Sequence, residues 1–296
     1  MAERRKAAKR STSVGKPKRP AQRSAQSALS IATDAKRTIK QRVAAMAEVP
    51  LAVYENDADL QVMLQVLRDK DEPVEVRLAA LQALQAASFS VVAFAAYRGD
   101  YIATLRAVVE DAHPELRQRV LGILAREKDG FAQQKLLEGL QDPDKALVPP
   151  EKALQLLSYD VHADAYPVAR AIVSQPPNAT AKREALRLLA ADASAAPLFE
   201  QILRDKDEAP EVRQISAAAL QAIKPETLQA HAREMLLDPS EQGEMQAVCL
   251  TALAQFGNDA ALAHDEVLLN RVDQLRSEKS TTVQQSAHQF LSKYGR

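Results

Sequence analysis

The sequence predicts an all-α protein, a right-handed α-solenoid (α–α superhelix) of about seven helix pairs. The first observation is a repeated segment, because residues 69–84 read DKDEPVEVRLAALQAL and residues 205–220 read DKDEAPEVRQISAAAL. The second is composition, since Ala, Leu and Gln favour helices and the chain has only 8 Gly and no Trp. The third is the period: apolar helical stripes recur every 31 to 40 residues, and repeats of that size stack on one another.

The beginning of the chain differs from the rest in composition. Residues 1–27 hold almost no large apolar residue, so they cannot bury enough surface to offset their ordering entropy, and we expect a disordered basic arm. Residues 28–56 are expected to form a lead-in helix that caps the first repeat. Residues 57–296 are expected to form the solenoid itself.

Within the solenoid, each pair consists of a first helix, called A, and a second helix, called B. The A helices carry apolar residues at i, i+3, i+4 and i+7, as in Leu60, Met63, Leu64 and Leu67. The B helices carry an alanine-rich stripe that ends in leucine. These stripes begin at positions 77, 117, 150, 182, 213, 246 and 284. Prolines fall between the helices, where they are tolerated at a first turn.

The alternation, the period and the recurring Asp, Pro, Val and Arg resemble HEAT repeats, in particular the short form of bilin lyase subunits. The resemblance covers roughly residues 57–296 and weakens where Pro150, Lys182, Gln246 and Gln284 replace the arginine. In each of three copies an aspartate stands six residues before an arginine, where its carboxylate can cap the B helix. The resemblance implies that such pairs bridge adjacent repeats as a structural ladder. The candidates are Asp71 and Arg77, Asp111 and Arg117, and Asp207 and Arg213.

Two sets of residues are candidates for binding a partner. B helices usually line the concave face of a solenoid, and a basic, amide-rich groove there would accept an acidic peptide or a phosphate backbone. A dense aromatic cluster also lies in the extra length of the first repeat interval, where insertions often lie on the binding side. The candidates are Gln85, Arg119, Arg126, Arg183 and Arg187 on the B helices, and Phe89, Phe94, Tyr97 and Tyr101 in the insert. A solvated helix face and a wedge between uneven repeats explain the same residues.

The charge is divided between the arm and the body. Residues 1–42 hold 13 Lys and Arg against 2 acids, a net +11, so the remainder of this neutral chain carries −11. The arm could bind phosphates of nucleic acid without reading sequence. It could equally be a solubilising tail, a partner for the acidic body, or a nuclear or organellar address. The candidate phosphate-binding residues are Arg4, Arg5, Lys6, Lys9, Arg10, Lys16, Lys18, Arg19 and Arg23.

Signatures of catalysis and of bound cofactors are missing. The sequence has no phosphate-cradling Gly-rich loop, no G-x-S-x-G and no H-E-x-x-H, and its five histidines lack metal-ligand spacing. Cys249 is the single cysteine, so no internal disulfide forms. We therefore expect no catalytic, cofactor or metal residues and a chain that is not an enzyme. With no apolar run of about 20 residues, we expect no membrane contact and a cytoplasmic location.

These observations favour a non-catalytic scaffold or adaptor that binds a protein partner on its concave face, with the basic arm as a tether. One alternative is a nucleic-acid-associated protein that grips phosphates through the arm. Another is an enzyme subunit similar to the bilin lyases, although no catalytic residue carries over from them. The sequence leaves the identity of the partner and the oligomeric state open.

Overall fold

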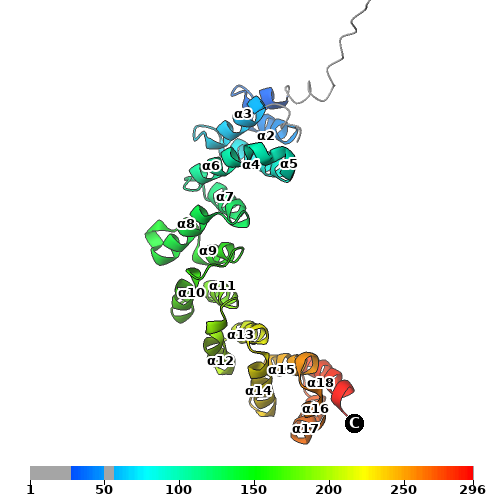
Figure 1. The fold of residues 1–296 in the computed structure, drawn as a ribbon. Helices are drawn as coiled ribbons and strands as arrows, with labels where there is room; N and C mark the ends of the chain where they lie inside the picture. Colours follow the sequence, from blue (N-terminus) through cyan, green and yellow to red (C-terminus); the bar gives the residue numbers. More distant parts are fainter. Residues whose placement is uncertain (1–27, 50–56, 296) are drawn as a thin grey trace, which may run out of the picture. The chain divides into compact units, whose positions relative to one another are not determined.

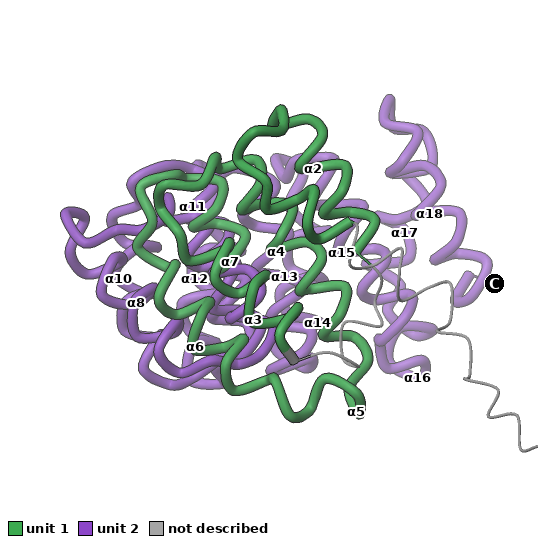
Figure 2. The backbone as a smooth tube through the Cα atoms, turned by 90° about the horizontal axis from the view of Figure 1, so that it is seen from above, with its two compact units in different colours: residues 1–120 green, residues 121–296 purple. Residues whose placement is uncertain are grey.

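The computed structural model describes residues 28–49 and 57–295, and in these residues it contains helices and turns but no strand (Figure 1). The predicted basic arm, residues 1–27, lies outside the described residues, as do residues 50–56 of the predicted cap. The chain divides into two compact units, residues 1–120 and residues 121–296, which are coloured separately in Figure 2. Each unit is described by itself.

Unit 1 begins with a short helix over residues 28–33. The elements that follow are α2 (Ile39–Ala47), α3 (Asp57–Arg68), α4 (Val74–Ser88), α5 (Val91–Phe94), the 3₁₀ turn η2 (Ala95–Tyr97), α6 (Arg98–Val108) and α7 (Pro114–Arg126), within which the division falls. Helix α3 packs against α4 and α6, and α4 also packs against α2. In unit 1 the first helices of successive pairs, α3 and α6, thus lie side by side, and α4 lies between α3 and α2.

Unit 2 continues the same order. Its elements are α8 (Gly130–Gln141), η3 (Pro143–Lys145), α9 (Pro150–Leu157), α10 (Ala165–Ser174), α11 (Ala179–Leu189), η4 (Ala193–Ala195), α12 (Ala196–Arg204), α13 (Pro210–Ile223), α14 (Pro225–Leu237), α15 (Gly243–Phe256), α16 (Asp259–Ala263), α17 (Glu266–Leu275) and α18 (Thr281–Tyr294). The B helices pack in chain order, α9 on α11, α11 on α13, α13 on α15, and α15 on α18.

The predicted fold class is confirmed: the chain is an all-helical α-solenoid. Between residues 57 and 295 the structure has seven A–B pairs, and every B helix contains one of the seven predicted starting positions. The pairs are α3/α4, α6/α7, α8/α9, α10/α11, α12/α13, α14/α15 and α17/α18. The short elements α5, η2 and α16 occupy the longer connections.

Local sequence explains where the helices begin. Pro114, Pro150, Pro210 and Pro225 each occupy the first position of a helix, where a missing N–H costs nothing. Helix α2 begins with a capping box, in which the Thr38 hydroxyl and the Gln41 side chain satisfy each other's backbone N–H groups. At the start of later helices, a single side-chain oxygen accepts a backbone N–H of the first turn, from Asp129, Asn178, Asn258, Asp265 and Ser280.

The core follows from the two apolar stripes. Leu60, Leu64 and Leu67 of α3 are almost fully buried, and each such leucine contributes roughly 1.5–3 kcal/mol relative to an exposed one. On the B helices, Ala80 and Ala217 are buried, and their small side chains let neighbouring helices approach closely.

The helices of the described residues are short or interrupted by polar positions compared with a membrane span. No single helix there is long and apolar enough to cross a bilayer. One consecutive pair, α4 with Val91–Val108, reaches the required length and composition together but is bent by 115° at its break.

Candidate functional site

Arg213 ties two successive helix pairs together. Its Nε donates to the carbonyl of Leu203, ten residues earlier, at 2.9 Å. Its Nη1 and Nη2 donate to the two carboxylate oxygens of Glu241 at 2.8 Å each. Both side chains are enclosed, with 0% and 1% of their surface exposed. The bidentate geometry and the additional bond to a carbonyl offset part of the cost of removing these two charges from water.

Arg77 repeats this arrangement in unit 1. Its Nε donates to the carbonyl of Leu67 at 3.1 Å, again ten residues earlier, and its Nη2 donates to Asp111 at 2.7 Å. Burial by itself would raise the pKa of the Asp111 carboxyl. The backbone N–H of His113 and the Arg77 guanidinium outweigh burial and hold that pKa below its ordinary value.

Two further pairs occupy equivalent places. Arg42 of α2 donates to the carbonyl of Ala32 at 2.8 Å and pairs with Glu72 at 2.6 Å. Lys182 of α11, at one of the positions where arginine is replaced, pairs with Glu208. We call the four pairs Arg42–Glu72, Arg77–Asp111, Lys182–Glu208 and Arg213–Glu241 the ladder. In each, a cation on a B helix, or on α2 in the case of Arg42, reaches a carboxylate in the turn of the next helix pair.

None of the three predicted aspartate–arginine pairs forms between its two side chains, because Arg77 pairs with Asp111 and Arg213 with Glu241 of the following helix pair. Asp71 and Asp207 are exposed, and the ladder carboxylates are their neighbours Glu72 and Glu208. The reason lies in the turn, where the carboxylates of Asp69 and Asp205 accept the backbone N–H groups of Asp71 and Asp207.

The predicted helix caps and Arg117 also need correction. Pro73 and Ala209 begin α4 and α13 without any side-chain cap, so Asp71 and Asp207 do not cap these helices. Arg117 donates to the carbonyls of Asp111 and Ala112 in its own turn, at 2.8 Å and 3.1 Å. Arg117, at the position where other B helices carry a ladder cation, therefore stabilises the turn before its own helix and does not bridge to the next helix pair.

The aromatic candidates separate into buried and exposed groups. Phe94 and Tyr101 are each 1% exposed, and their ring centroids lie 5.4 Å apart, edge to face. Tyr97 is half-buried, with its ring centroid 6.3 Å from that of Phe94. These rings fill the space inside the bend from α4 to α6, so the interpretation of Phe94 and Tyr101 as partner-binding residues is wrong. Phe89 remains 77% exposed.

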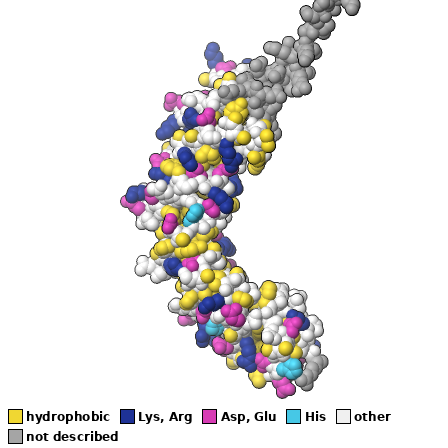
Figure 3. Space-filling view, viewed as in Figure 1, with side chains coloured by type: hydrophobic (Ala, Val, Ile, Leu, Met, Phe, Trp, Pro, Cys, Tyr) yellow, Lys and Arg dark blue, Asp and Glu magenta, His cyan; other side chains and the backbone are white. Residues whose placement is uncertain are grey.

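The polar candidates on the B helices do not form a basic groove. Arg119 pairs with Glu115 at 2.8 Å, Arg183 pairs with Glu211 at 3.0 Å, and Arg187 pairs with Glu184. Arg126 lies exposed in the last turn of α7, and Gln85 is half-buried in α4. Basic and acidic side chains are interspersed on the face of each unit drawn in Figure 3. Three of the arginines expected to bind an acidic partner thus have their positive charge neutralised by a neighbouring glutamate.

A groove of about 660 Å³ lies over α13, α15 and α18 of unit 2. Its floor contains the buried side chains of Ala217, Ala247 and Ala252, and Ala218 lies exposed within it. Phe256, 51% exposed, is at its border. The other lining residues are mostly uncharged amides and hydroxyls: Gln214, Gln221, Leu228, Glu244, Val248, Thr251, Gln255, Ser280, Thr282 and Ser286.

One buried side-chain oxygen among the residues that line this groove has no hydrogen-bond partner. The Oε1 of Gln221 is buried and receives no donor from the described residues. A buried acceptor without a donor costs roughly 1–3 kcal/mol, so a donor brought by a ligand would be favoured here. Glu244, in the first turn of α15, is the one charged residue among those that line the groove.

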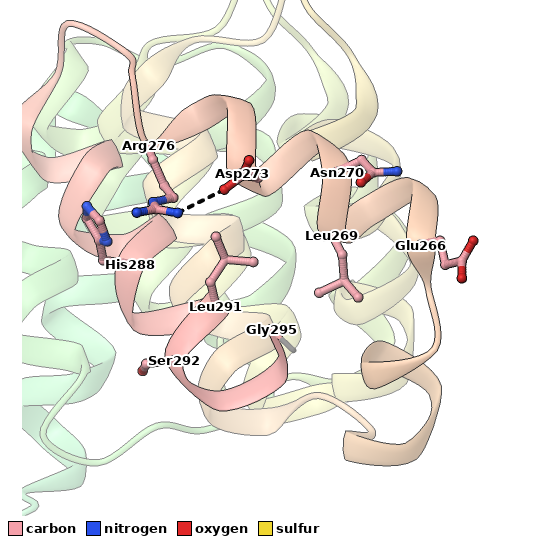
Figure 4. Close-up of a pocket in the computed structure, with 9 residues that line it drawn as sticks. All are labelled: Glu266, Leu269, Asn270, Asp273, Arg276, His288, Leu291, Ser292 and Gly295. Carbon is pink, nitrogen blue, oxygen red and sulfur yellow. Dashed lines mark hydrogen bonds and ion pairs between the residues drawn. The ribbon is translucent and has the colours of Figure 1, made fainter.

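A second groove, of about 630 Å³, lies between α17 and α18 (Figure 4). Leu269 and Leu291 lie in its middle, while Arg276 pairs with Asp273 at 3.0 Å along one helix. Glu266 and His288 also line it, so its surface is more polar than that of the first groove. The groove over α13, α15 and α18 is therefore the better candidate for binding an apolar segment.

The described residues offer neither a cluster of metal ligands nor a reactive thiol. No group of three or more His, Cys, Asp or Glu side chains there could hold a metal ion. Cys249 is 2% exposed, and burial raises the pKa of its thiol to about 12. A thiol with that pKa stays protonated and is a poor nucleophile.

Among known proteins, two solved structures are similar to this chain in fold. No family model and no curated protein matches the chain. The structure of human deoxyhypusine hydroxylase in complex with glycerol is similar at 16% identity and a TM-score of 0.36, covering 83% of this chain and 99% of that one. The crystal structure of an engineered protein is similar at 15% identity and a TM-score of 0.46, covering 92% of this chain and 89% of that one.

One expectation from the sequence is corrected by this comparison. We expected the chain not to be an enzyme because catalytic motifs are missing, yet the human protein with a similar helical fold is a hydroxylase. The expectation that the chain is not an enzyme is withdrawn. No residue role is carried over at this level of similarity.

Proposed function

We propose that this chain is a HEAT-like scaffold that binds an extended segment of a partner protein in the groove over α13, α15 and α18. The observation that carries this proposal is the alanine floor bordered by amides and hydroxyls. Small floor residues admit an apolar side chain closely. Glutamine and hydroxyl side chains can pair with the backbone N–H and C=O groups that an extended segment leaves free.

Charge supports a basic character for the partner segment. Residues 205–295 contain 8 Lys and Arg against 14 Asp and Glu, a net charge of −6. Glu244 lines the groove itself, so a Lys or Arg beside the apolar anchor would face a carboxylate. A partner segment with one apolar side chain flanked by basic residues fits these features, and the unpaired Gln221 Oε1 would accept one of its backbone N–H groups.

The groove is tested by selecting short random peptides on the full chain and measuring their affinity for two matched variants. Ala218→Arg places a long charged side chain in the groove, and Ala222→Arg places the same side chain on an exposed position of α13 outside the lining residues. We expect selected peptides to carry basic residues, to bind Ala222→Arg as they bind the natural chain, and to lose at least tenfold in affinity for Ala218→Arg. Equal binding to the two variants would refute the groove.

Nucleic acid remains a second proposal for the arm alone, since Arg119, Arg183 and Arg187 are offset by glutamates. Binding of duplex DNA to the full chain, measured at several salt concentrations, tests it. Phosphate binding by the arm predicts a steep decrease of affinity with salt and a smaller slope after residues 1–27 are removed. Unchanged affinity after that removal would reject it.

A further inference from the structure

The corner between α4 and α5 exposes three large apolar side chains. Phe89 is 77% exposed, Val91 68% and Val92 92%, and no other large apolar side chain of the described residues is as exposed. We call these three residues the apolar corner. Single exposed apolar residues are ordinary on a protein surface, whereas larger exposed apolar patches are typical of contact sites, and these three residues lie within four positions of the chain.

The apolar corner is held outward by what lies behind it. The backbone N–H of Phe94 donates to the carbonyl of Ser90 at 2.9 Å, and that of Ser90 donates to Ala87 at 3.1 Å. The Phe94 side chain occupies the interior and packs edge to face on Tyr101. Because the interior is filled, the valines cannot turn inward. Helix α5 lies at the edge of unit 1 in both Figures 1 and 2.

The stretch of chain that contains the apolar corner is uncharged. No Asp, Glu, Lys or Arg occurs between Arg77 and Arg98. Ala93, Ala95 and Ala96, which follow the corner, are also exposed. Protein interfaces usually surround an apolar centre with a polar rim of hydrogen-bonding groups, whereas a bilayer requires only that no charge be desolvated. The corner therefore fits a lipid surface better than a protein cleft.

The same unit carries a strong positive charge. Residues 1–27 contain nine Lys and Arg against one acid, a net charge of +8. This arm joins unit 1 at Ala28 and Leu29, which are buried, and the following helix α2 packs on α4, the helix that ends at the apolar corner. Stable attachment to a membrane surface requires two signals, and an apolar insertion with a polybasic segment provides them.

We propose that unit 1 binds peripherally to an anionic lipid bilayer, with Phe89, Val91 and Val92 inserted at the boundary of headgroups and acyl chains and the basic arm on the headgroups. This inference goes beyond the proposed groove in unit 2 and does not depend on it. It also replaces the expectation of no membrane contact, which rested on the lack of a spanning helix.

Co-sedimentation of the full chain with vesicles tests the proposal. One set of vesicles contains phosphatidylcholine alone and the other phosphatidylcholine with phosphatidylserine. We expect binding to the second set, a decrease of about tenfold or more for the double variant Val91→Glu, Val92→Glu, and a similar loss when residues 1–27 are removed. Val267→Glu is the matched control, because Val267 is 62% exposed on α17 of unit 2, and it should bind as the natural chain does.

Insertion has a direct optical readout. The chain has no Trp, so Val92→Trp provides a single reporter, and its emission should shift to the blue with phosphatidylserine vesicles. Circular dichroism shows whether the glutamate variant stays folded, as expected for exposed positions. The proposal is overturned if the natural chain does not sediment with anionic vesicles, or if the glutamate variant binds them equally. Binding of a protein through the corner without vesicle binding would also overturn it.

Discussion

The carboxylate of Glu241 closes around a guanidinium that belongs to the preceding helix pair, and the Arg213–Glu241 pair is the most enclosed ion pair among the described residues. Its third hydrogen bond, to the carbonyl of Leu203, anchors the arginine to the A helix of its own pair. One side chain thus fixes an A helix, a B helix and the next turn. The same arrangement at Arg77 shows that this is a repeated element of the solenoid.

Breaking the Arg213–Glu241 pair should be costly. Arg213→Ala leaves a buried carboxylate without its partner, so we expect a loss of about 3–5 kcal/mol in the free energy of unfolding by urea. Arg183→Ala removes an exposed pair and should cost less than about 1 kcal/mol. Similar losses for the two variants would show that the enclosed pair is not a principal contact.

Two adjacent acids, Asp207 and Glu208, should contribute very differently to stability, because only Glu208 belongs to the ladder. Glu208→Gln removes the charge that faces Lys182, and we expect a loss of about 1–3 kcal/mol in thermal unfolding. Asp207→Asn changes an exposed side chain and should remain within about 0.5 kcal/mol of the natural chain. The opposite order would show that Asp207, and not Glu208, is the carboxylate that stabilises this part of the ladder.

Acid should weaken unit 1 through Asp111. Because the folded-state pKa of Asp111 lies below its unfolded value, its contribution to stability is present above pH 4 or so and is lost as the pH falls through the folded pKa. Asp111→Asn removes this dependence, so its unfolding free energy should be lower at pH 7 and should decrease less between pH 4 and pH 2. Parallel curves for the two chains would contradict the assignment.

The aromatic insert should behave as a packed wedge. Phe94→Ala empties a buried site beside Tyr101, and we expect a loss of about 3–5 kcal/mol. Phe89→Ala changes an exposed side chain and should leave the melting temperature nearly unchanged. If Phe89→Ala lowered stability as much as Phe94→Ala, then Phe89 would also belong to the packed interior.

Cys249 should report opening of the last repeats. Its thiol is buried and its pKa is raised to about 12, so Ellman's reagent should react slowly with the folded chain and rapidly in urea. In Arg213→Ala the native reaction should be faster, because α13 packs directly on α15, which carries Cys249. Rapid reaction of the natural chain would show that this region opens readily.

Periodicity predicted much of the architecture. The leucine stripes and the prolines at first helical turns locate all seven pairs, because a helix must bury its apolar face and proline is tolerated only at its start. The spacing of the residues did not predict which acid belongs to the ladder. That depends on which aspartate accepts the backbone N–H groups of the turn. Asp69 and Asp205 fold the turn, and the next carboxylate to face inward is a glutamate.

The groove could be predicted less well. Its lining comes from α13, α15 and α18, so it depends on how closely three helices approach. Gln221 could be found as a polar position on a B helix, but the exposed alanine beside it, Ala218, carries no signal in the sequence. The burial of Phe94 and Tyr101 likewise follows from the bend before α6, which the pattern of apolar residues does not specify.

The ladder also determines where the chain can be cut. A fragment ending after α13, at Ile223, would keep Arg213 and lose Glu241, leaving a guanidinium with one carbonyl in place of three acceptors. A fragment ending at Gln242 would keep that carboxylate but lose the helix that covers it. Soluble fragments of this protein should therefore include the complete helix pair that follows the last arginine they retain, and expression trials that cut between α13 and α15 should give aggregated material.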